Sequence, residues 1–248
     1  VDVTNSNMIE YTRENVFTNA AAPQYVGGAV ENVLKAESAI TFTLANSPVV
    51  TLAHWIPASK QVLDDSSLLQ AYIASRLLYG LRLTEELQIL KGDGATGNMS
   101  GILNTGNFTA YNRTTAGDTY IDQLDRASTQ VALGDLEPTA IVINPEDWET
   151  IRHLKTTANE YVLGQPADPI PPRLWGLPVV ATNAMTKGTY LVGDFQRGAQ
   201  IWDRQEARVE VSREDGSNFV KNMLTILWEE RLALTVYRPL AFVKGTFV

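Results

Sequence analysis

The chain has 248 residues, of which 44% are hydrophobic and 19% are charged, a composition that is typical of a folded protein and excludes general disorder. It contains no cysteine, which excludes disulfides, thiolate zinc sites and thiol nucleophiles, and no stretch approaches the roughly eighteen apolar residues of a membrane helix. The net charge of -8 argues against a sequence-neutral grip on nucleic acid, because such binding requires clustered lysine and arginine.

The N-terminal quarter of the sequence predicts a long hairpin. Residues 1–8 are polar and unpatterned, as expected of an arm or linker, and two strand-like runs follow at 9–18 and 39–56. Such a hairpin is too thin to hold a core, so we expect it to lie against a neighbouring subunit. Because the sequence starts at Val1 without a leader-like segment, we expect a processed or incompletely ordered remainder of a longer chain.

A long amphipathic helix is predicted at 64–90, with a cap provided by Asp64, Asp65 or Ser66. The stretch GDGATGNMSG (92–101) follows and fits the spacing G-x-G-x-x-G. A nucleotide-binding glycine loop follows a strand and opens a helix, whereas these glycines end a helix, and the lysine and hydroxyl residue of a P-loop are missing. The favoured interpretation is Gly92 in a left-handed conformation followed by a mobile loop, with a nucleotide site as the lesser alternative.

The rest of the chain mixes helices and strands. A helix is predicted at 118–133, a buried strand at 139–143 and a second helix to about Thr156, which Asn144 and Pro145 begin as cap and first residue. Segment 158–172 is expected to be a loop. Further strands are predicted at 177–181, 189–192, 199–202, 208–213, 219–237 and 241–247. The fold class is therefore α+β.

Candidate catalytic residues are sparse. The two histidines, His54 and His153, lack the spacing of a metal site, so no metal or cofactor is expected. A Ser-His-Asp triad stays open as an alternative, because its members come from distant places in a chain, but no G-x-S-x-G motif supports one. The paired acids at 64–65 and 85–86 are best interpreted as a helix cap and a solvated helix face. We therefore do not expect an enzyme that acts on a diffusible substrate.

Several stretches resemble the major capsid proteins of tailed bacteriophages of the Hong Kong 97 type. They are EYTRENVFTN (10–19), TLAHWIPASKQVLDD (51–65), LLYGLRLTEELQILKGDGATGNMSGIL (77–103), INPEDWETIRHLK (143–155), LWGLPVVAT (174–182) and VEVSREDGSNFVKNMLTILWEERLALTVYRP (209–239). The resemblance implies a phage capsid fold with an extended hairpin called the E-loop, a peripheral domain with a long spine helix, and an axial domain.

The resemblance also implies domain limits. The expected parts are the end of an N-terminal arm at 1–8, the E-loop hairpin with the strands leading into it at 9–56, the peripheral domain at 57–97 and 203–236 with its spine helix at 64–90, and the axial domain at 98–202 and 237–248. On this interpretation GDGATGNMSG connects two domains, and its glycines are hypothesised to let the domains tilt as a shell changes shape.

Known relatives join subunits by isopeptide bonds between a lysine and an asparagine, assisted by a glutamate. The matching residues are Lys35, Asn222 and Glu229, and Glu229 beside Leu227 and Trp228 would accept the lysine proton. Asn222 and Glu229 are seven residues apart, so a bulge or bend must intervene for them to share a face. Ordinary roles stay open: a solvated lysine, an asparagine in a turn or ladder, and a glutamate paired with Arg231 or with an arginine of a neighbour.

The resemblance implies a major capsid protein that forms hexamers and pentamers of an icosahedral virion shell around double-stranded DNA, assembled in the host bacterial cytoplasm. Expected partners are copies of itself, a portal, a maturation protease and a scaffolding segment, without sequence-specific DNA binding and without a membrane. An acidic subunit suits this role, because a weakly repelling inner wall lets packaged DNA slide. The alternatives are an encapsulin-like compartment and a soluble hydrolase or nucleotide-binding enzyme.

Overall fold

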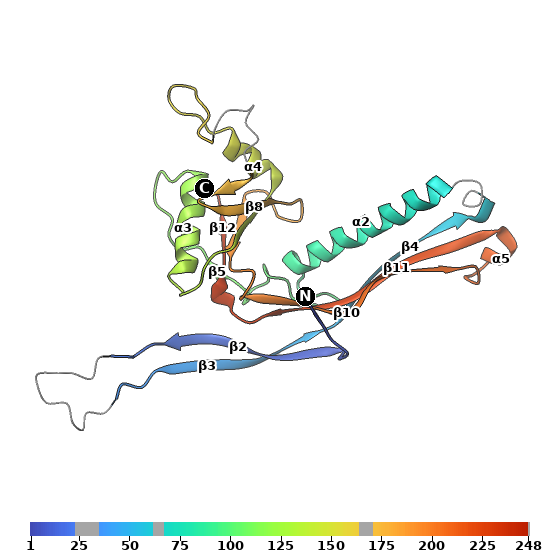
Figure 1. The fold of residues 1–248 in the computed structure, drawn as a ribbon, viewed down its shortest axis with the longest axis horizontal. Helices are drawn as coiled ribbons and strands as arrows, with labels where there is room; N and C mark the ends of the chain where they lie inside the picture. The colour runs from blue at the N-terminus through green and yellow to red at the C-terminus, as the bar shows by residue number, and fades with distance from the viewer. Residues whose placement is uncertain (23–34, 62–66, 164–170, 248) are drawn as a thin grey trace, which may run out of the picture.

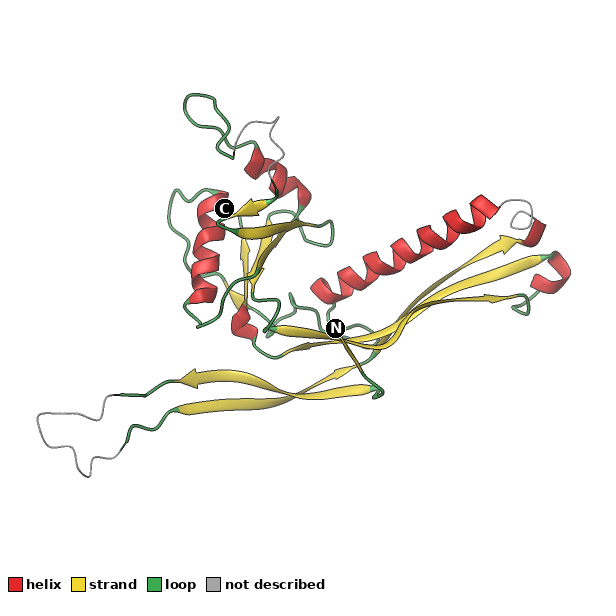
Figure 2. Ribbon diagram, in the orientation of Figure 1, coloured by secondary structure: helices red, strands yellow, loops and turns green. Residues whose placement is uncertain are grey.

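Three parts of the chain meet near the N-terminus in this computed structural model, which describes residues 1–22, 35–61, 67–163 and 171–247 (Figure 1). A two-stranded hairpin extends to one side, an arm built from a long helix on a sheet extends to the other, and a mixed helix-and-strand part lies above the hairpin (Figure 2). The predicted α+β class is confirmed, and the described helices and strands lie close to most of the predicted ones.

The hairpin consists of β2 (Met8–Thr18) and β3 (Ala39–Pro48), paired antiparallel as predicted. The prediction of one continuous strand at 39–56 is wrong, because β3 ends at Pro48 and β4 (Val50–Ser59) pairs with a different strand. Proline has no N–H to donate, and Val50 and Leu52 beyond it are buried in the main core. The chain therefore leaves the hairpin at Pro48 and enters the core. Residues 23–34 of the predicted hairpin tip lie outside the described residues.

The arm is a four-stranded sheet covered on one face by α2 (Ser67–Lys91). Its strand order is β1 (Asp2–Val3), β10 (Ala199–Ser212), β11 (Met223–Val236) and β4. The helix confirms the one predicted at 64–90, spans about 38 Å at 1.5 Å per residue, and packs through Leu77 on Leu224 and Ile226. The three predicted caps, residues 64–66, lie outside the described residues.

Two strand predictions in the arm need correction. The separate strands expected at 199–202 and 208–213 are one strand, β10, whose pairing with β11 shifts register twice between Asp203 and Arg208. The run expected at 219–237 begins with a helical turn, α5 (Asn218–Lys221), before β11 starts. Asn222 ends that turn in a left-handed conformation, with φ 53° and ψ 42°. A strand-like composition does not show where the pairing register shifts or where one residue turns left-handed. Periodicity therefore predicted neither the bulged pairing of β10 nor the turn at Asn222.

The glycine stretch after α2 forms a closed, hydrogen-bonded loop. Gly94 N–H donates to the Met99 carbonyl (2.9 Å) and Gly101 N–H donates to the Gly92 carbonyl (2.8 Å), around the fully buried Met99 side chain. The prediction that Gly92 is left-handed is wrong: the positive φ angles are at Gly94 (71°) and Gly97 (89°). Gly92 is needed for space, because an added Cβ would lie 2.2 Å from the Met99 carbonyl oxygen. The loop is thus closed by its own hydrogen bonds and anchored in the core at Gly92 and Met99, while residues 93–97 are exposed.

The third part is a six-stranded mixed sheet with two helices. Its strand order is β5 (Thr109–Ala110), β12 (Phe242–Thr246), β9 (Thr189–Gly193), β6 (Ala140–Ile143), β8 (Leu177–Ala181) and β7 (Arg173–Leu174). The helices are α3 (Tyr120–Ala132) and α4 (Pro145–Arg152), and the short η1 (Pro239–Ala241) precedes β12. Asn144 caps α4 as predicted, with its side chain accepting from Glu146 N–H at 2.9 Å. The helix ends at Arg152, before the predicted Thr156.

Candidate functional site

Glu229 lies in the middle of β11, directly opposite Arg208 of β10 and Ala53 of β4. Its Oε1 atom accepts a hydrogen bond from Gln205 Nε2 (3.1 Å) and forms an ion pair with Arg208 Nη2 (3.2 Å). The partner considered from the sequence, Arg231, donates instead to Asn7 at 3.3 Å. Glu229 therefore pairs with Arg208, which lies opposite it on the neighbouring strand, and not with Arg231, the arginine nearest to it along the chain.

Only one of the two apolar residues expected beside Glu229 shares its face. Side chains alternate along a strand, so Leu227 points to the same side of the sheet as Glu229, whereas Trp228 points to the other. Trp228 packs on the helix side of the sheet against the cluster of Leu77 and Ile226. The carboxylate of Glu229 is therefore partly open, with its side chain 24% exposed, instead of sitting between two large apolar groups.

Asn222 lies at the far end of the same strand. Its carbonyl accepts from Lys60 N–H (2.9 Å) and its side chain is exposed at the junction of α5 and β11. The bulge required for Asn222 and Glu229 to share a face is absent from the β11–β4 pair, which runs in unbroken register over 223–232. At about 3.3 Å per residue, the seven steps between the two residues span roughly 23 Å. Asn222 precedes β11 in a left-handed conformation, so strand alternation does not decide which face its side chain takes.

Lys35 is exposed and precedes β3, near the end of the hairpin. The hairpin and α5 extend to opposite ends of the molecule (Figure 1). The structure therefore places the three predicted site residues in three separate regions of one chain: Lys35 by the hairpin tip, Asn222 at the tip of the arm and Glu229 in the middle of its sheet.

Glu230, the neighbour of Glu229, faces the opposite way and is buried, with 7% of its surface exposed. Burial raises the pKa of Glu230 to about 7, with further contributions from Glu85 and Asp203 and opposition from Arg82. Its Oε1 atom has no hydrogen-bond partner within the described residues. The acid pair in the sequence therefore splits into one partly open carboxylate and one buried carboxyl group.

The two histidines lie apart. His54 packs under α2, where an added Cβ on Gly80 would lie 3.1 Å from its Cε1 atom, and His153 is exposed and pairs with Glu149 at 3.9 Å. Within the described parts of the chain, no group of three or more histidines and acids is close enough to hold a metal ion. Among the same residues, no helix combines the length and apolar character needed to cross a bilayer.

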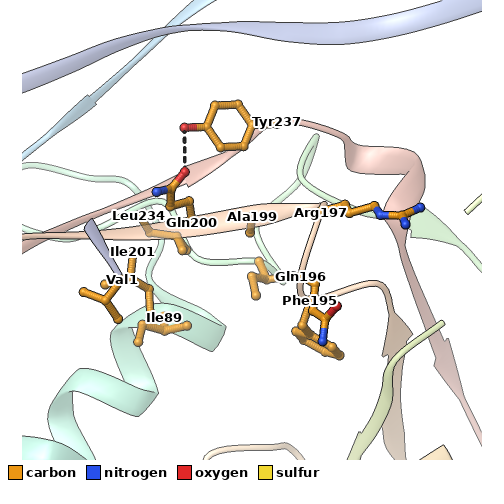
Figure 3. Close-up of a pocket in the computed structure, with 11 residues that line it drawn as sticks. Val1, Ile89, Phe195, Gln196, Arg197, Ala199, Gln200, Ile201, Leu234 and Tyr237 are labelled. Atoms are coloured by element: carbon orange, nitrogen blue, oxygen red, sulfur yellow. Dashed lines mark hydrogen bonds between the residues drawn. The ribbon is translucent and has the colours of Figure 1, made fainter. Parts of the chain in front are cut away.

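A cavity of about 640 Å³ lies where the end of α2, β10 and the turn before β10 meet (Figure 3). Its walls are mainly apolar, and Tyr237 donates its hydroxyl proton to Gln200 Oε1 at 3.2 Å across one side. Arg197 is the one charged side chain among its eleven described lining residues. The cavity therefore offers no acid–base pair and does not involve the glycine stretch.

Gln205 and Arg208, which contact Glu229, carry no sequence signal that would have singled them out. They are three residues apart, so in a regular strand they would face opposite sides. Three steps along β10, from Gln205 to Arg208, match two steps along β11, from Arg231 to Glu229, so β10 carries one extra residue there. This bulge brings both side chains to one carboxylate, and it is visible only in the pairing register.

An extended hairpin without a core, a long helix on a sheet arm and a separate mixed sheet together define a capsid-type subunit. The chain matches the Phage capsid family over residues 1–247 and therefore belongs to that family. It is 50% identical over 246 residues to the major capsid protein of Enterobacteria phage HK97, covering 98% of this chain and 62% of that protein. The resemblance to phage capsid proteins is thereby confirmed.

Solved structures confirm the fold. The capsid protein of an empty GTA particle superposes with a TM-score of 0.73 at 20% identity, covering 100% of this chain and 87% of that one. The corresponding chain of Mycobacterium phage Bobi gives a TM-score of 0.72 at 14% identity and covers 99% and 87%. At such identities the likeness establishes the phage capsid fold alone.

Proposed function

We propose that this chain is the major capsid protein of a bacteriophage virion, which assembles into hexamers and pentamers of an icosahedral shell enclosing double-stranded DNA. The observation that carries the proposal is the hairpin of β2 and β3. The hairpin exposes large apolar side chains that are each at least 49% exposed: Val16, Phe17, Ile40, Phe42 and Leu44. An isolated two-stranded hairpin is only marginally stable, and clustered exposed apolar residues mark an interaction surface. A second copy of the chain supplies the missing cover.

Electron microscopy of the full-length protein expressed in bacteria tests this proposal. We expect closed shells with icosahedral symmetry, in which the hairpin of each subunit lies on a neighbour. Monomers or small oligomers with a saturable small-molecule ligand would instead support a soluble enzyme. Shells that contain co-purified protein cargo and no DNA would support an encapsulin-like compartment.

The assembly partners follow from the same proposal. A portal, a maturation protease and a scaffolding segment act with the shell during its assembly in the host bacterial cytoplasm. Packaged DNA is enclosed without sequence-specific contacts, in keeping with the net charge of -8. A strongly basic inner wall in an assembled shell would contradict this part of the proposal.

Covalent joining of subunits is the second part of the proposal. The Lys35 ammonium loses a proton to Glu229, and the free amine attacks the side-chain carbonyl carbon of Asn222. A new C–N bond forms and the amide C–N bond breaks, with the first proton passing from Glu229 to the departing nitrogen, while the attacking nitrogen gives up its second proton through Glu229 to solvent. Ammonia leaves and an isopeptide bond remains. No oxidant and no cofactor is required.

The separation of these residues within one chain supports a reaction between chains. Lys35 and Asn222 belong to parts that extend in opposite directions (Figure 1), so a bond between them joins two subunits. Glu229 is roughly 23 Å along the strand from Asn222 of its own chain, so the Glu229 that serves a given Asn222 belongs to another copy. The reaction therefore depends on assembly, which keeps the free subunit inert.

A further inference from the structure

Glu229 is held on one side only. Its Oε1 atom is contacted by both Gln205 Nε2 and Arg208 Nη2, whereas its Oε2 atom accepts no hydrogen bond or ion pair within the described residues. Two donors on one oxygen fix the plane and direction of a carboxylate and leave the other oxygen to accept a proton. The bulge in β10 is what makes this double contact possible.

We propose that Gln205 and Arg208 are positioning residues for Glu229 in the crosslinking reaction, an inference that rests on the crosslinking function proposed above. They aim Oε2 of Glu229 outward from the sheet, where the Lys35 ammonium of another subunit delivers its proton. Neither residue touches Lys35 or Asn222 of its own chain. Both act through the carboxylate that they hold.

Arg208 contacts two acids on this face of the sheet. The same Nη2 atom contacts Glu210 at 2.9 Å and Glu229 at 3.2 Å, so the two carboxylates share one guanidinium nitrogen. Opposite Glu229 on the third strand stands Ala53, which is uncharged. The charged groups near Glu229 on this part of the sheet are Arg208, Glu210 and Arg231.

The test is the pH dependence of crosslinking in shells of the full-length protein that have assembled but not yet crosslinked. The fraction of joined subunits is followed over time by denaturing gel from pH 5 to pH 9. Because general-base catalysis contributes about 10²–10⁴ in rate, we expect Arg208→Ala to lower the rate at neutral pH by roughly tenfold or more. Arg208→Lys, which keeps a charged donor on the same strand, restores most of the rate.

Two further variants separate positioning from charge. Glu210→Gln weakens the competing contact and leaves Arg208 on Glu229, so the crosslinking rate is retained. Gln205→Leu replaces the amide donor with an apolar side chain of similar size. It lowers the plateau rate by roughly threefold or more, in line with the loss of one hydrogen bond to a charged group. Arg173→Ala, on a strand of the other sheet, is the matched control and leaves the profile unchanged.

The outcomes distinguish this inference from the proposal beneath it. Wild-type shells without any crosslinks overturn both. Wild-type shells that crosslink, together with Arg208→Ala shells of unchanged rate and profile, overturn the positioning role alone. If Arg208→Ala does not assemble, Gln205→Leu decides, because it leaves Arg208 in place: an unchanged plateau rate overturns the inference. A control that shifts with the variants would also overturn it, because the effect would then not be specific to the Glu229 site.

Discussion

Adjacent glutamates on β11 have opposite surroundings because a strand alternates its side chains between the two faces of a sheet. Glu229 faces outward among polar partners and keeps part of its side chain open to solvent. Glu230 faces inward near Glu85 and Asp203, whose own pKa values are also raised, first of all by burial. The inward side is therefore a place where protonation favours the folded chain.

The stability of the subunit should fall as pH rises past the titration of Glu230. Its pKa of about 7 in the folded chain lies above the ordinary value of 4.5, so the folded state binds the proton more tightly. The cost of burying the charge is absent below about pH 4.5 and fully present above pH 7. Glu230→Gln should raise the free energy of unfolding at pH 8 by on the order of 1–3 kcal/mol and leave it unchanged near pH 4.5.

Urea unfolding of the purified subunit at both pH values measures this effect. Glu137→Gln, an exposed acid on the other part of the chain, serves as the control and should show no comparable gain. A Glu230→Gln variant with the same pH dependence as the wild type would contradict the assigned burial cost.

At the scale of single residues, the sequence predicted which residue types matter but not who their partners are. Lys35, Asn222 and Glu229 were proposed as site residues by resemblance. That Glu229 pairs with Arg208, 21 residues away along the chain, depends on the bulged register of β10 and β11. Local patterning contains no information on such pairing, whereas the Asn144 cap of α4 is a local signal and was predicted correctly.

Among the structural elements, the closed loop after α2 contrasts two glycines, one without room for a side chain and one with open space around it. An added Cβ at Gly92 would lie 2.2 Å from the Met99 carbonyl oxygen and 2.6 Å from the Gln88 carbonyl oxygen. Gly97 has φ of 89° but open space around it. We therefore expect Gly92→Ala to destabilise by about 3 kcal/mol or more, as backbone clashes in a core do, and Gly97→Ala by about 1–2 kcal/mol.

Thermal unfolding of the two variants provides the comparison. Equal losses would show that the loop can shift to accommodate Gly92→Ala, contrary to the packing described. The earlier hypothesis of a glycine hinge remains a prediction about the shell. On this geometry any tilt would move the loop as a unit, since its backbone groups are bonded to each other.

The root of the hairpin is anchored mainly by Arg13. Its guanidinium donates to the Val236 carbonyl (3.1 Å), the Gly106 carbonyl (3.1 Å), the Tyr11 hydroxyl (3.2 Å) and Asn107 Oδ1 (2.8 Å). The hairpin is thus tied both to β11 and to the loop region after α2.

Arg13→Lys should loosen the hairpin, because an ammonium cannot reproduce the planar fork of donors. We expect amide hydrogen exchange in β2 and β3 to accelerate by roughly tenfold while exchange in β6 and β9 stays unchanged. Thr41→Ala, on β3 away from the root, is the control. Unchanged exchange in the hairpin of the lysine variant would mean that the anchor lies elsewhere.

Among the structural elements, the helices and the pairing of the two hairpin strands could be predicted from the sequence, whereas a strand's change of pairing partner could not. The apolar spacing of α2 and the alternation of the early strands follow from local periodicity. The change of pairing partner at Pro48, from β3 on β2 to β4 on β11, can be predicted only when the tertiary position of β11 is known. The short turn of α5 before β11 is likewise a matter of tertiary context.

For the whole molecule, the separation of Lys35 from Asn222 makes a prediction about mixed shells. Lys35→Arg subunits retain the asparagine, and Asn222→Ala subunits retain the lysine, so neither variant crosslinks alone. Shells assembled from both should contain bonds that join one subunit of each kind. Because each subunit then has one reactive group, denaturing gels should show dimers and nothing larger. Longer products in mixed shells would mean that other residues form bonds.

Covalent joining of subunits is best tested by a denaturing gel of matured, assembled shells of the full-length protein, followed by mass spectrometry of the products. Wild-type shells should give a ladder, or material too large to enter the gel, in a chain that has no cysteine. Peptides containing Lys35 and Asn222 should be joined with the loss of one ammonia, and Glu229→Gln shells should assemble but give a single band. A single band at the mass of the subunit from wild-type shells would contradict the crosslinking account.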